Sequence, residues 1–475
     1  MDSKLVESGY SAIHHRLERV PWRMLFCSLS ANLLVISLGL LISWYSPVIP
    51  KLMLNNTDVN PLDKPISALE TSIITVIPSI GAIILFPFWA YIVDRIGRKT
   101  TMRMISSILI CSVITTAFAK NINTYYISLP LTGISVNGGL LTASVYNTEI
   151  SKDSNRGMFN CIMMMHIPIG IVLGYIFGSI MSVKCLSLLS TIPPILFLIA
   201  SFFLPESPYY LLLKQNYLEG TKALEILRGT TNPREIETEI KKIKEIIAST
   251  TLSKSRTIRD IFSNFAIRKA FLISIQITSI EQLSGLSIIL IYVSPIFNKA
   301  GSGLSGDSVG IIVGVLKLVT FSLATYHSDR LGRRKLILIS TLCCAFPMFF
   351  LGFYFYLDHI GSQVLNNFKW ISVILVVIYI ISYSIGLGNV PLTFAGEVFP
   401  EDMRALGVSL VLIVNQSIMC IVIFAFPLVS FYYGPHWCFW ICAMFCVIGF
   451  ISMYLTVPET KGKSFLEIQH LFKKA

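Results

Sequence analysis

Apolar residues gather in twelve long runs along the chain, and short polar segments separate each run from the next. A helix needs about 20 predominantly apolar residues to cross a bilayer, and the runs have about that length. The pattern therefore predicts an all-α membrane protein with twelve transmembrane helices. The runs cover residues 24–47, 70–93, 101–119, 125–146, 159–180 and 187–204, and then 270–295, 306–328, 335–357, 370–394, 405–430 and 436–457.

One long hydrophilic segment divides the runs into six and six. Within it, residues such as Leu224, Leu227, Ile236 and Ile240 recur at helical spacing among Lys and Glu. This spacing favours short amphipathic helices over a disordered linker. The expected units are an N-terminal segment 1–23, a first bundle 24–204, the linker 205–269, a second bundle 270–457 and a tail 458–475.

A short motif occurs at equivalent places in the two halves. Residues Asp94–Lys99 end the second run, and residues Asp329–Lys335 end the eighth. The copies start 329 − 94 = 235 residues apart in a chain of 475 residues. In each copy a glycine permits a tight reversal of the chain beside several cations. The repeat predicts two homologous halves.

The charge pattern sets the topology. Charged residues make up only 13% of the chain and hydrophobic residues 54%, whereas a soluble domain has roughly 25% charged residues. A net charge of +12 could indicate nucleic acid, but the cations stand beside apolar runs, so membrane topology explains them better. Lys and Arg concentrate on the cytosolic side of membrane proteins, and a signal peptide is not evident before the first run. Both termini are therefore expected in the cytosol. The basic segments begin near Asp94, Glu149, Pro205, Asp329, Glu397 and Pro458.

Acid–base elements also repeat at the expected cytosolic helix ends. Glu149 and Arg156 are seven residues apart, as are Glu397 and Arg404. One interpretation makes each element a topological anchor. The favoured one is an inner gate of ion pairs between the halves, which form in one transport state and break in another. The candidate gate residues are Asp94, Arg98, Glu149, Arg156, Glu206, Asp329, Arg333, Glu397, Arg404 and Glu459.

Two charges are expected near the middle of the bilayer. Glu281 lies eleven residues past Ala270, and Lys317 lies twelve before Asp329. At 1.5 Å per residue both lie about 17 Å from the cytosolic helix ends. A charge at that depth costs at least ~2.5 kcal/mol, so both should face the interior, and a direct ion pair is the simplest hypothesis. The pair could be structural, or it could bind a ligand. His166 at similar depth fits packing better than proton transfer.

Other chemistry is limited. Asn55 begins a glycosylation sequon on the expected outer side. The ten cysteines lie in or beside apolar runs without metal-ligand spacing, and Cys438, Cys442 and Cys446 are interpreted as packing residues on one helix face. We expect no catalytic residue, metal, cofactor or enzymatic activity, because no phosphate loop or nucleophile–base pairing stands outside the runs.

The full set of motifs resembles the sugar porter family of the major facilitator superfamily. Trp44-Tyr45-Ser46-Pro47 resembles, more weakly, the insect facilitated trehalose transporter branch. The resemblance implies two six-helix bundles, alternating access and a central sugar site. It rests on Asp94–Lys99, Glu149–Gly157, Pro205–Pro208 with Tyr210–Leu212, Gln282–Gly285, Asp329–Arg334, Glu397–Arg404 and Pro458–Gly462.

The family's sugar site is kept only in part. Gln282 and Asn415 match its amides, but Glu281 replaces a glutamine, Ser287 an asparagine and Lys317 an amide residue. These five residues are the expected substrate-binding positions. The other departures are Met164 for a glutamine, Leu392 for a tryptophan and Gln416 for a second tryptophan.

The resemblance also bears on energy coupling. Proton-coupled relatives carry an acid in the first run and an arginine in the fourth, but the first run has no acid and Leu129 takes the arginine position. We therefore expect facilitated transport of trehalose or a hexose across the plasma membrane. The expected partners are the sugar and the bilayer, without nucleic acid or an obligate protein. A proton-coupled carrier, a carrier of another solute and a non-transporting nutrient sensor remain alternatives.

Overall fold

The computed structural model describes residues 21–459 apart from 57, 153, 231, 253–257, 301–302, 364 and 366–367. These described residues form helices and no strand. The first half comprises α2 (Trp22–Leu52), α3 (Ala68–Ile96), α4 (Arg98–Ala117), α5 (Ile122–Ile150), α6 (Arg156–Ile180), α7 (Val183–Leu189) and α8 (Ile192–Ala200). The second comprises α13 (Phe265–Leu283), α14 (Leu286–Ala300), α15 (Gly306–Leu331), α16 (Arg333–His359), α17 (Ile371–Ile385), α18 (Val390–Val398), α19 (Glu401–Tyr432) and α20 (Pro435–Thr456).

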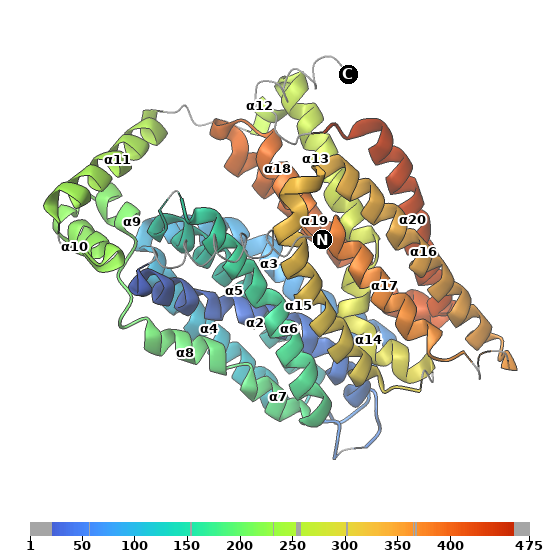
Figure 1. The fold of residues 1–475 in the computed structure, drawn as a ribbon. Helices are drawn as coiled ribbons and strands as arrows, with labels where there is room; N and C mark the ends of the chain where they lie inside the picture. Colours follow the sequence, from blue (N-terminus) through green and yellow to red (C-terminus); the bar gives the residue numbers. More distant parts are fainter. Residues whose placement is uncertain are drawn as a thin grey trace, which may run out of the picture.

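Each predicted run coincides with one helix or with two consecutive helices, which confirms the all-α membrane fold (Figure 1). Eleven segments of the described residues are long and apolar enough to cross a membrane. Helix α5 corresponds to the remaining run. It has 29 residues but is more polar, and its Ser128, Thr132 and Asn147 are buried. Helices α2, α3 and α4 pack against α5, so these polar groups face protein rather than lipid.

Three runs that were predicted as continuous helices are broken. The sixth splits into α7 and α8, the seventh into α13 and α14, and the tenth into α17 and α18. Proline lacks a backbone N–H and disfavours helix in the residue before it, which accounts for the breaks ahead of Pro193 and Pro391. The third break follows Leu283, where Gly285 has φ = +98°.

The hydrophilic segment contains the expected short helices. They are α9 (Pro208–Leu213), α10 (Tyr217–Arg228), α11 (Pro233–Leu252) and α12 (Ile258–Ser263). Arg228 fixes α10 and α11 to the first half. Its Nη1 donates to the carbonyl of Ile150 at 2.8 Å, and its Nε donates to Glu239 at 2.9 Å. Helices α9–α11 therefore lie on the first bundle, as Figure 1 shows.

The two halves meet through α2, α3 and α6 on one side and α14, α15 and α19 on the other (Figure 1). We call the end of the bundles that contains Gly97 and Gly332 the turn end, and the opposite end the far end. Helix α2 runs from the turn end, where Met24 contacts Arg228, to the far end at Leu52.

Glycines permit close contact between α2 and α6. A Cβ on Gly170 would lie 2.2 Å from the carbonyl oxygen of Ile36, and a Cβ on Gly39 would lie 2.1 Å from that of Ile167. Gly174 and Gly178 instead face side chains of α2, since a Cβ on Gly174 would lie 2.0 Å from the Ser43 hydroxyl oxygen and one on Gly178 2.3 Å from the Pro47 ring. The glycines at four-residue spacing in α6 therefore allow close helix packing.

Gly170→Ala is expected to destabilise the protein by about 1–3 kcal/mol, because the added methyl overpacks the α2–α6 interface. The melting temperature of the purified protein in detergent measures this. Gly157→Ala is the matched control on the same helix, since its Cβ would meet nothing within 4 Å. Equal melting temperatures for both variants would contradict this account of the packing.

Candidate functional site

The repeated motif forms the same structure in both halves. Gly97 and Gly332 have φ of +95° and +89° and reverse the chain into α4 and α16. Glu206 accepts from the backbone N–H of Arg98 at 3.0 Å, and Glu459 accepts from that of Arg333 at 3.0 Å. Each acid caps a helix N-terminus, where a negative charge is favourable. The sequence repeat is therefore a structural repeat.

An ion pair lies beside each turn, largely buried in the first half and half-buried in the second. Arg98 is 3% exposed, and its guanidinium donates to Glu149 at 2.8 and 2.9 Å, with Asp94 at 3.1 Å. In the second half Arg333 lies 2.9 Å from Glu397. Burial raises the pKa of the Tyr210 hydroxyl beneath Arg98, which donates to the carbonyl of Arg95 at 2.9 Å.

These ion pairs each join residues of one half. Arg156 and Arg404 are exposed at the turn end, and the side chain of Asp329 lies outside the described residues. An inner gate of ion pairs between the halves therefore stays a prediction. It would require a state in which the turn ends come closer together.

Four of the five expected substrate-binding residues form one hydrogen-bond network at the break between α13 and α14. Gln282 donates to Asn415 Oδ1 at 3.2 Å and accepts from Ser287 at 2.9 Å. Asn415 donates to Glu281 Oε2 and to the carbonyl of Thr278, both at 3.3 Å. Gln282, Ser287 and Asn415 are each less than 10% exposed. Residues from α13, α14 and α19 are thus joined at one place.

Tyr383 of α17 extends this network to Lys317. Its hydroxyl donates to Glu281 Oε1 at 3.2 Å, and Lys317 Nζ lies 6.0 Å from the centre of its ring. The hypothesis of a direct ion pair is corrected here: among the described side chains, Lys317 has no carboxylate within ion-pair distance. Tyr383 contacts both charged residues instead. Sequence reasoning missed Tyr383, although a tyrosine inside a run as apolar as the tenth was a visible signal.

Lys317 faces the interior, as predicted. Gly310 and Gly314 lie on the same face of α15, and a Cβ on either would contact Tyr175 of α6 at 3.2 or 3.0 Å. Lys317 continues this face by one turn toward the turn end. In the first half, the ring of His166 bonds to the carbonyl of Ile162 at 2.7 Å, which suits a packing residue.

Hydrogen bonds between the halves lie near the far end. Ser46 and Ser294 share a hydrogen bond of 2.8 Å, and the Ser294 N–H donates to Ser46 at 3.0 Å. Thr75 bonds to the hydroxyl of Tyr292 at 2.8 Å, where α14 has a non-helical residue. The hydroxyl of Tyr175 donates to the carbonyl of Leu290. From the sequence, only the Trp44–Pro47 stretch marked this region.

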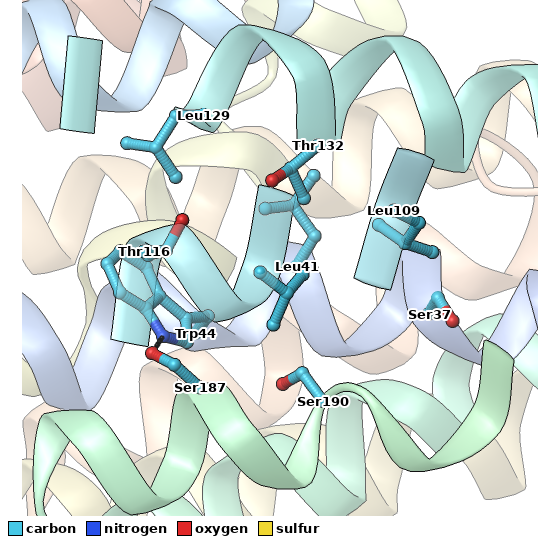
Figure 2. A pocket seen from close by; sticks show the side chains of 10 residues that line it. Ser37, Leu41, Trp44, Leu109, Thr116, Leu129, Thr132, Ser187 and Ser190 are labelled. Atoms are coloured by element: carbon cyan, nitrogen blue, oxygen red, sulfur yellow. Dashed lines mark hydrogen bonds between the residues drawn. The ribbon is translucent and has the colours of Figure 1, made fainter. Parts of the chain in front are cut away.

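A small cavity lies inside the first bundle between α2, α4, α5 and α7 (Figure 2). Trp44 lines one side of it and donates to the Ser187 hydroxyl at 2.9 Å. Its volume of about 30 Å³ suffices for water but not for a sugar. This cavity is therefore not a substrate site. Asn55, the predicted glycosylation site, is exposed beyond the far end of α2, and its modification stays a prediction.

Comparison with known proteins agrees with this geometry. Residues 32–472 match the family model described as sugar (and other) transporter. The facilitated trehalose transporter Tret1 of Apis mellifera ligustica is 27% identical over 460 residues, which cover 96% of this chain and 90% of that protein. Tret1 of Aedes aegypti is 30% identical over 378 residues, covering 80% of this chain but only 46% of that longer protein.

Solved structures show the same fold. The inward-open conformation of the xylose transporter XylE from E. coli has a TM-score of 0.77 at 19% identity, covering 94% of this chain and 99% of that one. The chain therefore has the same fold as a transporter of the major facilitator superfamily. The chain belongs to the sugar (and other) transporter family, whose class of function is sugar transport across a membrane.

Lys317→Met is expected to lower the melting temperature of the purified protein, because it removes the cation that faces the half-buried Glu281 carboxylate across Tyr383. Adding Glu281→Gln should recover most of the loss. The exposed Lys369→Met serves as the control for loss of a lysine. If the single and double variants are equally destabilised, the two charges are not coupled.

Proposed function

We propose that the protein is a facilitative sugar transporter of the plasma membrane that exposes one central site alternately to each side. Trehalose and hexoses are the proposed substrates. The protein performs no chemistry on them, needs no cofactor, and works without an obligate protein partner. The Tret1 relatives support this substrate class, since their names describe facilitated trehalose transport.

The network around Gln282 and Asn415 is the observation on which the proposal chiefly rests. Amides and hydroxyls both donate and accept hydrogen bonds, which suits a polyhydroxyl ligand. The network lies where α13 ends, and irregular backbone inside a membrane is tolerated where it is buried or lines a cavity. Ser287, Glu281 and Lys317 are proposed to complete the site.

The contacts between the halves support a state that is closed toward the far end. Hydrogen bonds of Ser46, Thr75 and Tyr175 tie α2, α3 and α6 to α14 there. At the turn end, Arg98 and Arg333 pair within their own halves. Rocking of the two bundles about the central site would exchange these contacts.

The basic turns orient the protein. Arg98, Lys99 and Arg103 follow one turn, and Arg333, Arg334 and Lys335 follow the other. Since cations concentrate on the cytosolic side, the turn end is proposed to face the cytosol together with both termini. Transport is proposed to be independent of protons, because residues 24–47 carry no acid and Leu129 stands where coupled relatives have arginine.

Lys317 and Glu281 favour a second candidate function. A neutral sugar needs neither charge. Yet Tyr383 of the network donates a hydrogen bond to Glu281, and Lys317 lies over its ring. The same scaffold could carry another solute, couple transport to protons, or act as a nutrient sensor without transport.

Uptake of labelled glucose and labelled trehalose in oocytes at two external pH values tests the proposal. We expect saturable uptake of at least one sugar, indifferent to pH. Gln282→Ala should reduce uptake at least about tenfold, since it breaks two hydrogen bonds of the site. Gln276→Ala, on the same helix but bonded to Ser452 at the turn end, should not.

Other outcomes separate the alternatives. Uptake that rises in acid would replace facilitation by proton coupling. A protein shown at the cell surface that takes up neither sugar would contradict the proposal and favour another solute or a sensor.

Ser46→Cys with Ser294→Cys tests the proposed state. An oxidant should join the two thiols, hold the far end closed and abolish uptake, and a reductant should restore it. The control pair Ser112→Cys with Thr132→Cys lies within the first half, where the hydroxyls are 2.6 Å apart. That pair should leave uptake intact. Uptake that survives complete cross-linking of positions 46 and 294 would refute the far-end gate.

A further inference from the structure

A second, much larger cavity lies at the turn end, apart from the network described above. It has a volume of about 1050 Å³ and lies between the loop that joins α5 to α6 and the helices α10 and α11. Small-molecule sites span roughly 300–1,000 Å³, so this space can hold a metabolite or a lipid headgroup. Its lining residues all belong to the first half or to the hydrophilic linker.

The walls of this cavity are fixed. Arg228 is 8% exposed and joins α10 to the last carbonyl of α5 and to Glu239 of α11. Ile236, on the buried face of α11, is 3% exposed. Lys244 of α11 lies 4.1 Å from the ring centre of Tyr217 in α10. The cavity is therefore pre-formed, which lowers the cost of binding a ligand.

The lining has an excess of positive charge. Five cations and three acids line it, but Glu149 is engaged by Arg98 and Glu239 by Arg228. Lys152, Arg156, Arg234 and Lys242 also line the cavity, against one further acid, Glu235. All four are exposed to solvent. Hydroxyl groups line the same space, those of Thr148, Ser151, Ser154, Thr230 and Thr238.

We infer that this cavity binds a phosphate-bearing ligand. Arginine and lysine recognise phosphate through charge-assisted hydrogen bonds, and the hydroxyls can bind phosphate oxygens or sugar hydroxyls. The same chemistry suits the phosphate of a soluble sugar phosphate. It also suits the headgroup of a phosphorylated lipid, because the cavity lies at the turn end of the bundle, where lipid headgroups are expected.

The ligand also links this cavity to transport. Arg156 lines the cavity and is one of the proposed inner-gate residues. A bound phosphate holds Arg156 on the first half and opposes closure of the turn end, so it slows turnover from the cytosolic side. This regulatory consequence rests on the proposed transport function, whereas binding does not.

Binding is measured on the full chain in lipid nanodiscs with glucose 6-phosphate, inorganic pyrophosphate and vesicles containing phosphatidylinositol 4,5-bisphosphate as separate probes. Arg234→Glu with Lys242→Glu should weaken binding at least about tenfold, because two charge-assisted contacts are lost. Lys222→Glu with Lys241→Glu is the matched control. It makes the same charge change on α10 and α11 at exposed residues that do not line the cavity.

Binding that weakens in the cavity variant but is retained in the control variant supports the site. The probe that binds with the highest affinity then shows whether the ligand is soluble or a lipid. Absence of binding by all three probes, or equal weakening in both double variants, would overturn the inference. Injection of the bound phosphate into oocytes should slow sugar uptake by wild type but not by the Arg234→Glu, Lys242→Glu variant. Unchanged uptake with intact binding would refute the link to the gate, and absent uptake without phosphate would instead refute the proposed transport.

Discussion

A bilayer interior offers no hydrogen bonds, and this constraint shapes the whole molecule. Some polar side chains inside the spans form hydrogen bonds with the backbone of their own helix, as Ser43 does with the carbonyl of Gly39 at 3.0 Å. Others bond to a neighbouring helix, as Ser112 does to Thr132. The same demand assembles the candidate site. Glu281 is tolerated inside the second bundle because Tyr383 and Asn415 both donate to its carboxylate.

The packing within each half differs from the contact between halves. Gly39 and Gly170 bring α2 and α6 to backbone contact, and the buried Arg98–Glu149 pair ties α4 to α5. Between the halves, a few hydrogen bonds near the far end, such as that between Ser46 and Ser294, join hydroxyl groups that water can replace. Two stiff bodies with exchangeable contacts are what rocking motion requires.

Much of the fold could be predicted from the sequence, because a membrane span leaves a long apolar run and a duplication leaves a repeated motif. The helix breaks could not, because proline accompanies a break at Pro193 and Pro391 but lies inside the continuous helices α2 and α6 at Pro47 and Pro168. Gln282, Ser287, Glu281 and Asn415 were predicted as one site, and they are joined by hydrogen bonds. The role of Tyr383 depends on how α17 packs against α13 and α15. The spacing of residues within one helix does not indicate which side chains of other helices they contact.

We propose that the far end opens as the turn end closes. Spin labels on the exposed positions Leu218 and Phe265 report on the turn end, and labels on Leu54 and Phe431 report on the far end. In nanodiscs, with the exposed native cysteines replaced, addition of the transported sugar should shift the distance distributions in opposite directions, shorter at the turn end and longer at the far end. Distances that stay constant, or that change in the same direction at both ends, would contradict alternating access by rocking bundles.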